Sequence, residues 1–88
     1  MKTAFRKSFT KDLRKIKSQS LLKRIRQIIE GAEAAEKLSD IGNLKKMTGD
    51  VSYYRIRVGD YRIGIFSDAD TIEFVRCLHR RELYRYFP

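Results

Sequence analysis

The alternation of apolar and polar residues is clearest in residues 51–66, VSYYRIRVGDYRIGIF. Two runs, YYRIRV and YRIGIF, alternate apolar residues with basic or small ones, and Gly59-Asp60 separates them. Alternation of this length is typical of half-buried strands, and a two-residue break containing glycine predicts a β-hairpin. With that loop length, one face of the hairpin is apolar and carries Tyr54, Ile56, Val58, Tyr61, Ile63 and Ile65.

The opposite face of the predicted hairpin is basic. Its side chains are Tyr53, Arg55, Arg57, Arg62, Gly64 and Phe66. The register places Arg57 across from Arg62, and like charges in that position destabilise a hairpin by about 0.2–1 kcal/mol. Gly64 faces Arg55 and is expected to leave room for a ligand. A bound anion explains this arrangement, but so does an ordinary solvated sheet face, and the sequence leaves both interpretations open.

Helical spacing dominates the chain before the hairpin. Phe9, Leu13 and Ile16 recur on one side of a first helix, for which Ser8 or Thr10 is the expected N-cap. Residues 18–20, SQS, break the pattern and offer a second cap. A second amphipathic helix is predicted to about residue 36, with an apolar stripe of Leu21, Leu22, Ile25, Ile28, Ile29 and Ala32. The short joint predicts an antiparallel helix pair.

The remaining segments complete a single domain over residues 1–88. Residues 3–6 are expected to form an edge strand, residues 38–49 a loop anchored by Leu44 and Met47, and residues 67–70 a turn before a third strand at 71–78. From residue 79 the chain is expected to end as a short helical turn or an extended tail. The predicted class is α+β: an N-terminal strand, an antiparallel helix pair and a three-stranded antiparallel meander, with the helices on one face of the sheet.

Two orientations are open for the third strand. A three-residue loop turns Val75 and Cys77 toward the core and places Arg76 beside Arg62. A four-residue loop turns Ile72 and Phe74 inward instead. The first is favoured.

Charge and composition narrow the function. The formal net charge of the 88 residues is +9, which favours a polyanionic partner such as nucleic acid, an acidic protein or an anionic membrane surface. No apolar run reaches the roughly 20 residues of a membrane span, and no signal peptide is recognisable, so a cytoplasmic location is expected. One cysteine, Cys77, and one histidine provide neither an internal disulfide nor a ligand set for structural zinc. No cofactor is expected.

The type of basic residue changes along the chain. Before Met47 the basic residues are mostly lysine, whereas after it they are all arginine, and all five tyrosines follow residue 50. Arginine binds phosphate through a planar fork, and arginine and tyrosine both stack on bases, as single-stranded RNA requires. We therefore expect the functional surface in the second half.

Four segments together resemble a known family. In chain order they are KSFTKDLRKI, NLKKMTG, YYRIRVGDYRIGI and FVRCLHRRELYR, and they are similar to the RelE/ParE superfamily of toxins from bacterial toxin–antitoxin pairs. The resemblance implies a toxin that an acidic antitoxin, encoded beside it, holds inactive. One branch of the superfamily enters the ribosomal A site and cuts messenger RNA without metal, through attack of a ribose 2′-OH. The other branch inhibits DNA gyrase.

The resemblance also implies site residues. The functional positions of the RNA-cutting branch match Arg55, Arg57, Arg62, Arg80 and Tyr84. Because all five hold a usable side chain, a ribosome-dependent endoribonuclease is expected. A gyrase inhibitor and a non-catalytic RNA- or ribosome-binding module are the alternatives. Some members carry lysine where this chain has arginine on the first hairpin strand, and arginine stays protonated and does not readily serve as a base.

Roles follow from the chemistry of this cleavage. Arg57 and Arg62 are expected to clamp the phosphate, Arg80 to stabilise the developing charge, and Tyr84 to orient the 2′-OH or stack on a base. His79 is a candidate base or acid, or else a strand-end residue bonded to a carbonyl. Glu73 and Glu82 are further candidates for the base. Additional RNA contacts are expected from Lys45, Lys46, Tyr53, Arg76, Arg81 and Arg85.

Overall fold

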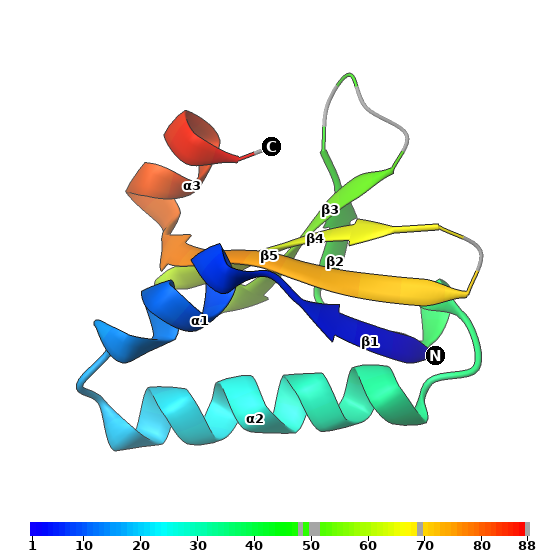
Figure 1. The fold of residues 1–88 in the computed structure, drawn as a ribbon, viewed down its shortest axis with the longest axis horizontal. Coiled ribbons are helices and arrows are strands. Elements are labelled where there is room, and N and C mark those ends of the chain that lie inside the picture. The colour runs from blue at the N-terminus through cyan, green and yellow to red at the C-terminus, as the bar shows by residue number, and fades with distance from the viewer. Residues whose placement is uncertain (48, 50–51, 69, 88) are drawn as a thin grey trace.

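A five-stranded sheet forms the centre of the protein in the computed structural model (Figure 1). The structure describes residues 1–47, 49, 52–68 and 70–87, so parts of the expected loop at 38–49 and turn at 67–70, the first residue of the hairpin stretch and the last of the tail lie outside the described residues. The elements are β1 (Lys2–Phe5), α1 (Lys7–Arg14), α2 (Gln19–Ala34), a 3₁₀ turn (Leu38–Asp40), β2 (Leu44–Lys46), β3 (Tyr53–Val58), β4 (Tyr61–Ser67), β5 (Thr71–His79) and α3 (Arg80–Tyr86).

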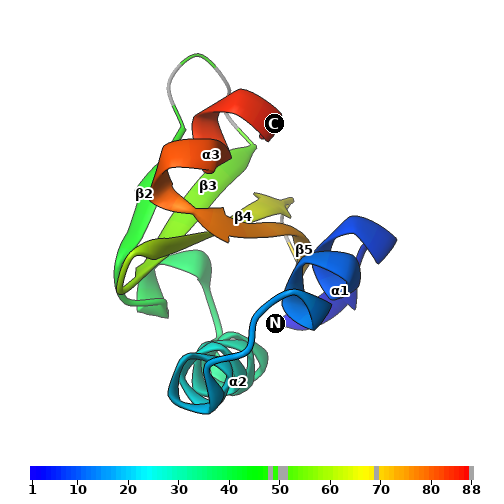
Figure 2. The same ribbon diagram turned by 90° about the vertical axis from the view of Figure 1, so that its left-hand side faces the viewer.

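The helices lie on both faces of the sheet, whose strand order is β1-β5-β4-β3-β2. Helices α1 and α2 run in opposite directions on one face, as expected (Figures 1 and 2). Helix α3, where a short helical turn or an extended tail was expected, lies on the other face. Among the described residues, no helix combines the length and apolar character that crossing a membrane requires.

The β3–β4 hairpin has the predicted register. Arg57 pairs with Arg62, Arg55 with Gly64 and Tyr54 with Ile65. Gly59 has φ of 59°, a left-handed conformation that glycine adopts without a Cβ penalty. The apolar face is buried as expected, and the side chains on it that are at most 1% exposed are Ile56, Val58, Ile63 and Ile65.

These hairpin residues form the main core with the helices. Phe9 and Ile16 come from the α1 region, and Ile25 and Ala32 from α2. Ser18 caps α2 by accepting a hydrogen bond from the Leu21 N–H, as expected. The helix ends at Ala34, two residues earlier than predicted.

The meander has four strands rather than three. Leu44–Lys46, expected in a loop, forms β2 and pairs antiparallel with β3, with Leu44 opposite Ile56. Three residues are too few to show an alternating pattern, so the pairing with β3 decides the structure. The predicted edge strand is present as β1, and it pairs in parallel with the first half of β5.

Neither predicted orientation of β5 is correct throughout, because the strand contains an irregularity. Ile65 pairs with Phe74, but Gly64 pairs with Arg76, so Val75 is an additional residue between them. Ile72 and Phe74 therefore join Cys77 in the main core, while Val75 packs on the opposite face. Arg76 lies across from Gly64 and not beside Arg62, whose partner is Leu78.

β1 pairs with the first half of β5, and side chains of α1 bond the backbone of its second half. The Arg6 N–H donates to the Phe74 carbonyl, and α1 begins directly afterwards. The Ser8 hydroxyl then donates to the Val75 carbonyl at 2.6 Å, and Asp12 accepts a hydrogen bond from the Cys77 N–H at 2.9 Å. Ser8 is therefore not the helix cap, and neither is Thr10; the N-cap position is Arg6, without a side-chain cap.

A second apolar cluster lies under α3. Its buried members are Met47, Val75, Leu83 and Phe87, with Tyr53 and Phe66 packed against them. The Phe87 ring occupies the space above Gly64, since a Cβ added there would lie 2.8 Å from three ring carbons. The expectation that Gly64 leaves room for a ligand is therefore wrong: the chain's own C-terminal segment fills that space.

This packing predicts opposite effects for two glycine substitutions. Gly64→Ala should lower the free energy of unfolding by about 1–3 kcal/mol, because the Phe87 ring must shift. Gly31→Ala should raise it by up to about 1 kcal/mol, because Gly31 lies inside α2 and a Cβ there meets nothing within 4 Å. Urea unfolding measures both. The Gly64→Ala cost should shrink in a Phe87→Ala background, and an unchanged cost would show that Phe87 does not limit this position.

Candidate active site

The facing arginines lie at the hairpin end, on the face opposite the main core. Arg62 is half-buried, and its Nη1 donates to the carbonyl oxygens of Gly59 and Tyr61, both at 2.9 Å. These two bonds fix the guanidinium near the hairpin turn. Arg57, directly across, is exposed.

Helix α3 begins beside the same turn. The Arg80 N–H donates to the Asp60 carbonyl at 2.8 Å, and buried Leu83 holds the helix on the sheet. Tyr84, in the same helix, is 60% exposed. The short α3 thus brings Arg80 and Tyr84 to the side of the sheet that carries Arg62.

The charges of the neighbouring groups act on Arg62. Partial burial lowers the pKa of Arg62, and the positive charges of Arg55 and Arg57 lower the pKa further. Arg80 also lowers this pKa, whereas Tyr84 raises it. Arginine remains charged in spite of such shifts. The five residues that the family resemblance indicated therefore form one cluster, which we call the arginine cluster: Arg55, Arg57, Arg62, Arg80 and Tyr84.

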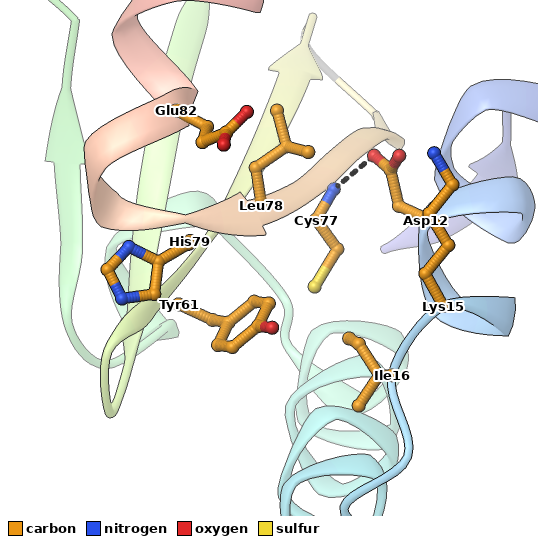
Figure 3. Close-up of a pocket in the computed structure, with 8 residues that line it drawn as sticks. All are labelled: Asp12, Lys15, Ile16, Tyr61, Cys77, Leu78, His79 and Glu82. Carbon is orange, nitrogen blue, oxygen red and sulfur yellow. Dashed lines mark hydrogen bonds between the residues drawn. The ribbon is translucent and has the colours of Figure 1, made fainter.

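His79 lies on the other side of β5. It pairs with Tyr61, whose ring is 5.8 Å away centroid to centroid, and Tyr61 packs against the main core (Figure 3). The His79 Nδ1 accepts the Arg81 N–H at 3.3 Å and so caps α3. The expected hydrogen bond from His79 to a carbonyl is thus replaced by a bond from a backbone N–H. The imidazole is not directed at the arginine cluster.

The carboxylates proposed as bases are also placed elsewhere. Glu73 forms an ion pair with Arg6 at 2.8 Å. Glu82, in the first turn of α3, lines a cavity of about 290 Å³ together with Asp12, Lys15, Ile16, Tyr61, Cys77, Leu78 and His79 (Figure 3). Among the described residues, the groups whose charges shift the pKa of Arg62 are Arg55, Arg57, Arg80 and Tyr84. Among the described residues, no three His, Cys, Asp or Glu side chains gather into a metal-binding group.

The additional RNA-contact candidates do not all lie on the same face of the sheet. Lys45 is exposed and lies opposite Arg55, whereas Lys46 lies opposite Tyr54, and successive strand residues point to opposite faces. Tyr53 packs its ring against Phe66 and Phe87 at centroid distances of 5.2 and 5.3 Å. Arg81 and Arg85 are exposed on α3. Only some of these candidates therefore share the face of the arginine cluster.

Arg76 has a structural partner that sequence analysis missed. Its Nε and Nη2 donate to the two carboxylate oxygens of Asp12 at 2.8 and 3.1 Å, and its guanidinium lies 5.7 Å from the centroid of the Tyr86 ring. Asp12 raises the pKa of Arg76 by hydrogen bonding. The signal for Asp12 was its position three residues after Phe9 and four before Ile16, which places a carboxylate on the apolar side of α1.

Comparisons with known proteins agree with this architecture. Residues 4–84 match the family described as the ParE toxin of the type II toxin–antitoxin system parDE. Toxin RelE3 of Methanocaldococcus jannaschii is 48% identical over 89 residues, covering all of both chains. The crystal structure of a RelB–RelE antitoxin–toxin complex from Methanococcus jannaschii has a chain with a TM-score of 0.82 and 46% identity, covering 97% of this chain and 99% of that one. The YoeB dimer from Staphylococcus aureus, with a TM-score of 0.72, 18% identity and coverage of 91% and 97%, shares the fold.

The facing arginines predict a gain in stability when one charge is removed. Arg57→Gln should raise the free energy of unfolding by about 0.2–1 kcal/mol at low salt, because Arg62 loses a like charge across the hairpin. Urea unfolding at low and high salt measures this gain, which should shrink as salt screens the repulsion. Lys2→Gln, at an exposed strand position opposite Thr71, is the matched control and should change little. A loss of stability in Arg57→Gln alone would contradict the repulsion.

The buried thiol predicts a pH dependence. Burial, and to a lesser degree the charge of Asp12, raises the pKa of Cys77 from 9.0 to about 12. Above 9.0 the unfolded thiol loses its proton while the folded thiol keeps it, so stability falls as pH rises, by about 1.4 kcal/mol per pH unit. The difference in unfolding free energy between wild type and Cys77→Ala should therefore be constant below 9.0 and decrease above it. A difference independent of pH would show that the thiol ionises equally in both states.

Proposed function

This chain belongs to the RelE/ParE superfamily and is a RelE-type toxin of a toxin–antitoxin system, and on this premise we propose that it is a ribosome-dependent endoribonuclease that cuts messenger RNA. The supporting observation is the arginine cluster. Arg62 is fixed near the hairpin turn, and the charges of Arg55, Arg57 and Arg80 act on it. This repulsion does not stabilise the folded protein. It would instead stabilise the negatively charged transition state in which the phosphorus is bonded to both the attacking and the leaving oxygen, because each positive charge attracts it.

The proposed reaction uses a hydroxyl of the RNA itself. The ribose 2′-oxygen attacks the adjacent phosphorus, its proton leaves, and the bond from phosphorus to the 5′-oxygen breaks as that oxygen takes up a proton. The products are a 2′,3′-cyclic phosphate and a 5′-hydroxyl. Arg57 and Arg62 bind the phosphate oxygens, Arg80 stabilises the additional negative charge of the phosphorane, and exposed Tyr84 orients the 2′-OH or stacks on a base.

The dependence on the ribosome follows from what the cluster lacks. His79 faces away, Glu73 is paired with Arg6, and arginine does not release its proton, so these residues of the described chain offer the phosphate no strong acid or base. Such a site provides charge but little proton transfer. Holding the 2′-OH in line with the leaving oxygen supplies a large part of the missing acceleration, and the ribosome would provide that alignment in the A site.

The partners follow from the same premise. The solved relative is a complex of RelE with the antitoxin RelB, and we propose that an acidic antitoxin encoded in the same operon holds this toxin inactive. The formal net charge of +9 is complementary to such a partner and to RNA. The proposed target places the active toxin in the cytoplasm.

Gyrase inhibition is the second candidate, because the matching family is described as that of ParE toxins. A gyrase inhibitor does not need the arginine cluster, so its activity would tolerate uncharged residues at Arg62. The two candidates therefore differ in their response to the same substitution.

Primer extension on a translated messenger in a purified translation system tests the proposal, with naked messenger alongside. Wild type should cut only the translated messenger. Arg62→Ala should lower the cutting rate about 10²–10³-fold, as expected for the loss of one transition-state donor, and Tyr84→Phe should also lower it.

Two control variants distinguish loss of chemistry from loss of structure. Tyr86→Phe removes a hydroxyl from another exposed tyrosine of α3 and should leave cutting unchanged. Lys2→Ala removes a distant exposed charge and should do the same. Intact messenger with wild-type toxin under every condition would overturn the nuclease, and gyrase-dependent DNA cleavage would then be assayed.

A further inference from the structure

A second basic surface lies on the helices, apart from the arginine cluster. Residues 13–29 contain six basic residues, no carboxylate and no aromatic residue. All six basic side chains are exposed. We call them the joint surface, because they lie on both sides of the connection between α1 and α2: Arg14, Lys15, Lys17, Lys23, Arg24 and Arg26.

The joint surface meets the arginine cluster at one end of the molecule. Figure 1 shows the α1–α2 connection, the β3–β4 turn and the start of α3 at its left, and Figure 2 views this end directly. A Cβ on Gly59 would lie 3.2 Å from the Arg24 Nη1, and the Gly59 carbonyl accepts the hydrogen bond from Arg62. Arg24 and Arg62 thus approach the same turn residue from the two surfaces.

The fold itself does not neutralise the joint surface. In the part of the chain that the structure describes, the two ion pairs are Arg6–Glu73 and Arg76–Asp12, and neither includes a joint-surface residue. The first turn of α2 contains no acidic residue, and its positive dipole end disfavours the nearby Lys17 and Lys23. The acidic residues of this region, Glu30, Glu33 and Glu36, follow at the opposite end. This order of charges opposes helix stability.

We propose that the joint surface binds the phosphate backbone of double-stranded RNA while the arginine cluster acts on the messenger. A protein partner would require exposed apolar anchors. The large exposed hydrophobic residues among those described are Phe5, Tyr84 and Tyr86, none of them on the joint surface. Single-stranded RNA would require aromatic stacking, which residues 13–29 do not offer. Cations without aromatic residues suit the backbone of an A-form helix.

This inference rests on the proposed function for its biological setting. A nuclease that works only on the ribosome has two RNA ligands, the folded ribosomal RNA and the extended messenger. Two adjoining basic surfaces of different chemistry match two such ligands. The joint surface would hold the toxin in place, and the arginine cluster would act on the scissile phosphate.

The test compares two double variants with equal charge change. Lys17→Gln with Lys23→Gln alters the joint surface, and Lys2→Gln with Lys37→Gln alters exposed lysines near the far end of α2, where the Met1 ammonium group bonds the Ala32 and Glu33 carbonyls. Association with an RNA hairpin of mixed sequence is measured over a range of salt concentrations. The salt slope is the slope of the logarithm of the association constant against the logarithm of the salt concentration. The joint variant should reduce its magnitude by about 2, roughly 1 for each phosphate that is no longer neutralised, and the control should change it by about 0.

Two further measurements separate the possible outcomes. On translated messenger, the joint variant should require a higher toxin concentration but reach the same cutting rate at saturation, at the same positions. If it reduces the salt slope no more than the control, the proposed docking is wrong. If it weakens binding to polyglutamate as much as to RNA, the surface serves an acidic protein and the RNA assignment is overturned. A reduced slope without cutting by any variant would retain the docking and reject the nuclease.

Discussion

The hydrogen-bonded Asp12 carboxylate is the interaction on which the assembly of α1, β5 and α3 depends. It is 5% exposed and accepts bonds from the Arg76 guanidinium and the Cys77 N–H. An unpaired buried carboxylate is unfavourable, and removing one partner of a buried ion pair costs about 3–5 kcal/mol. Because Arg76 also lies against the Tyr86 ring, the same carboxylate connects α1 through β5 to the helix that carries Arg80 and Tyr84.

The internal position of Asp12 also determines the electrostatics of the surface. It is the only carboxylate in the first 29 residues, and its charge is matched inside the fold by Arg76. The exposed lysines and arginines around it therefore have no acidic neighbour in the same segment. The partly buried Asp12–Arg76 ion pair thus connects α1 with β5 and leaves one end of the protein strongly cationic.

The sequence predicted those parts of the fold whose determinants lie within one short segment. The β3–β4 hairpin, including the pairing of Arg57 with Arg62, follows from alternation and a glycine turn, both contained in one short segment. Other features depend on distant segments. Leu44–Lys46 becomes a strand because Ile56 lies beside it. Val75 is an additional residue in β5 because α1 provides partners for that part of the strand. Phe87 fills the space above Gly64. His79 was the least predictable candidate, since its face depends on the register after that irregularity. The roles of the cluster residues stay predictions.

The parallel pairing of β1 with β5 has a consequence for synthesis of the protein. Lys2 is paired with Thr71, and Asp12 with Arg76, so the first elements of the chain bind the last strand. Contacts that join distant positions form only when both positions are available, and they are slow to close. A nascent chain therefore leaves the ribosome with β1 and α1 unpartnered until β5 has emerged. Folding of the toxin therefore waits for β5, because β1 and α1 have no partner strand before those residues have been made.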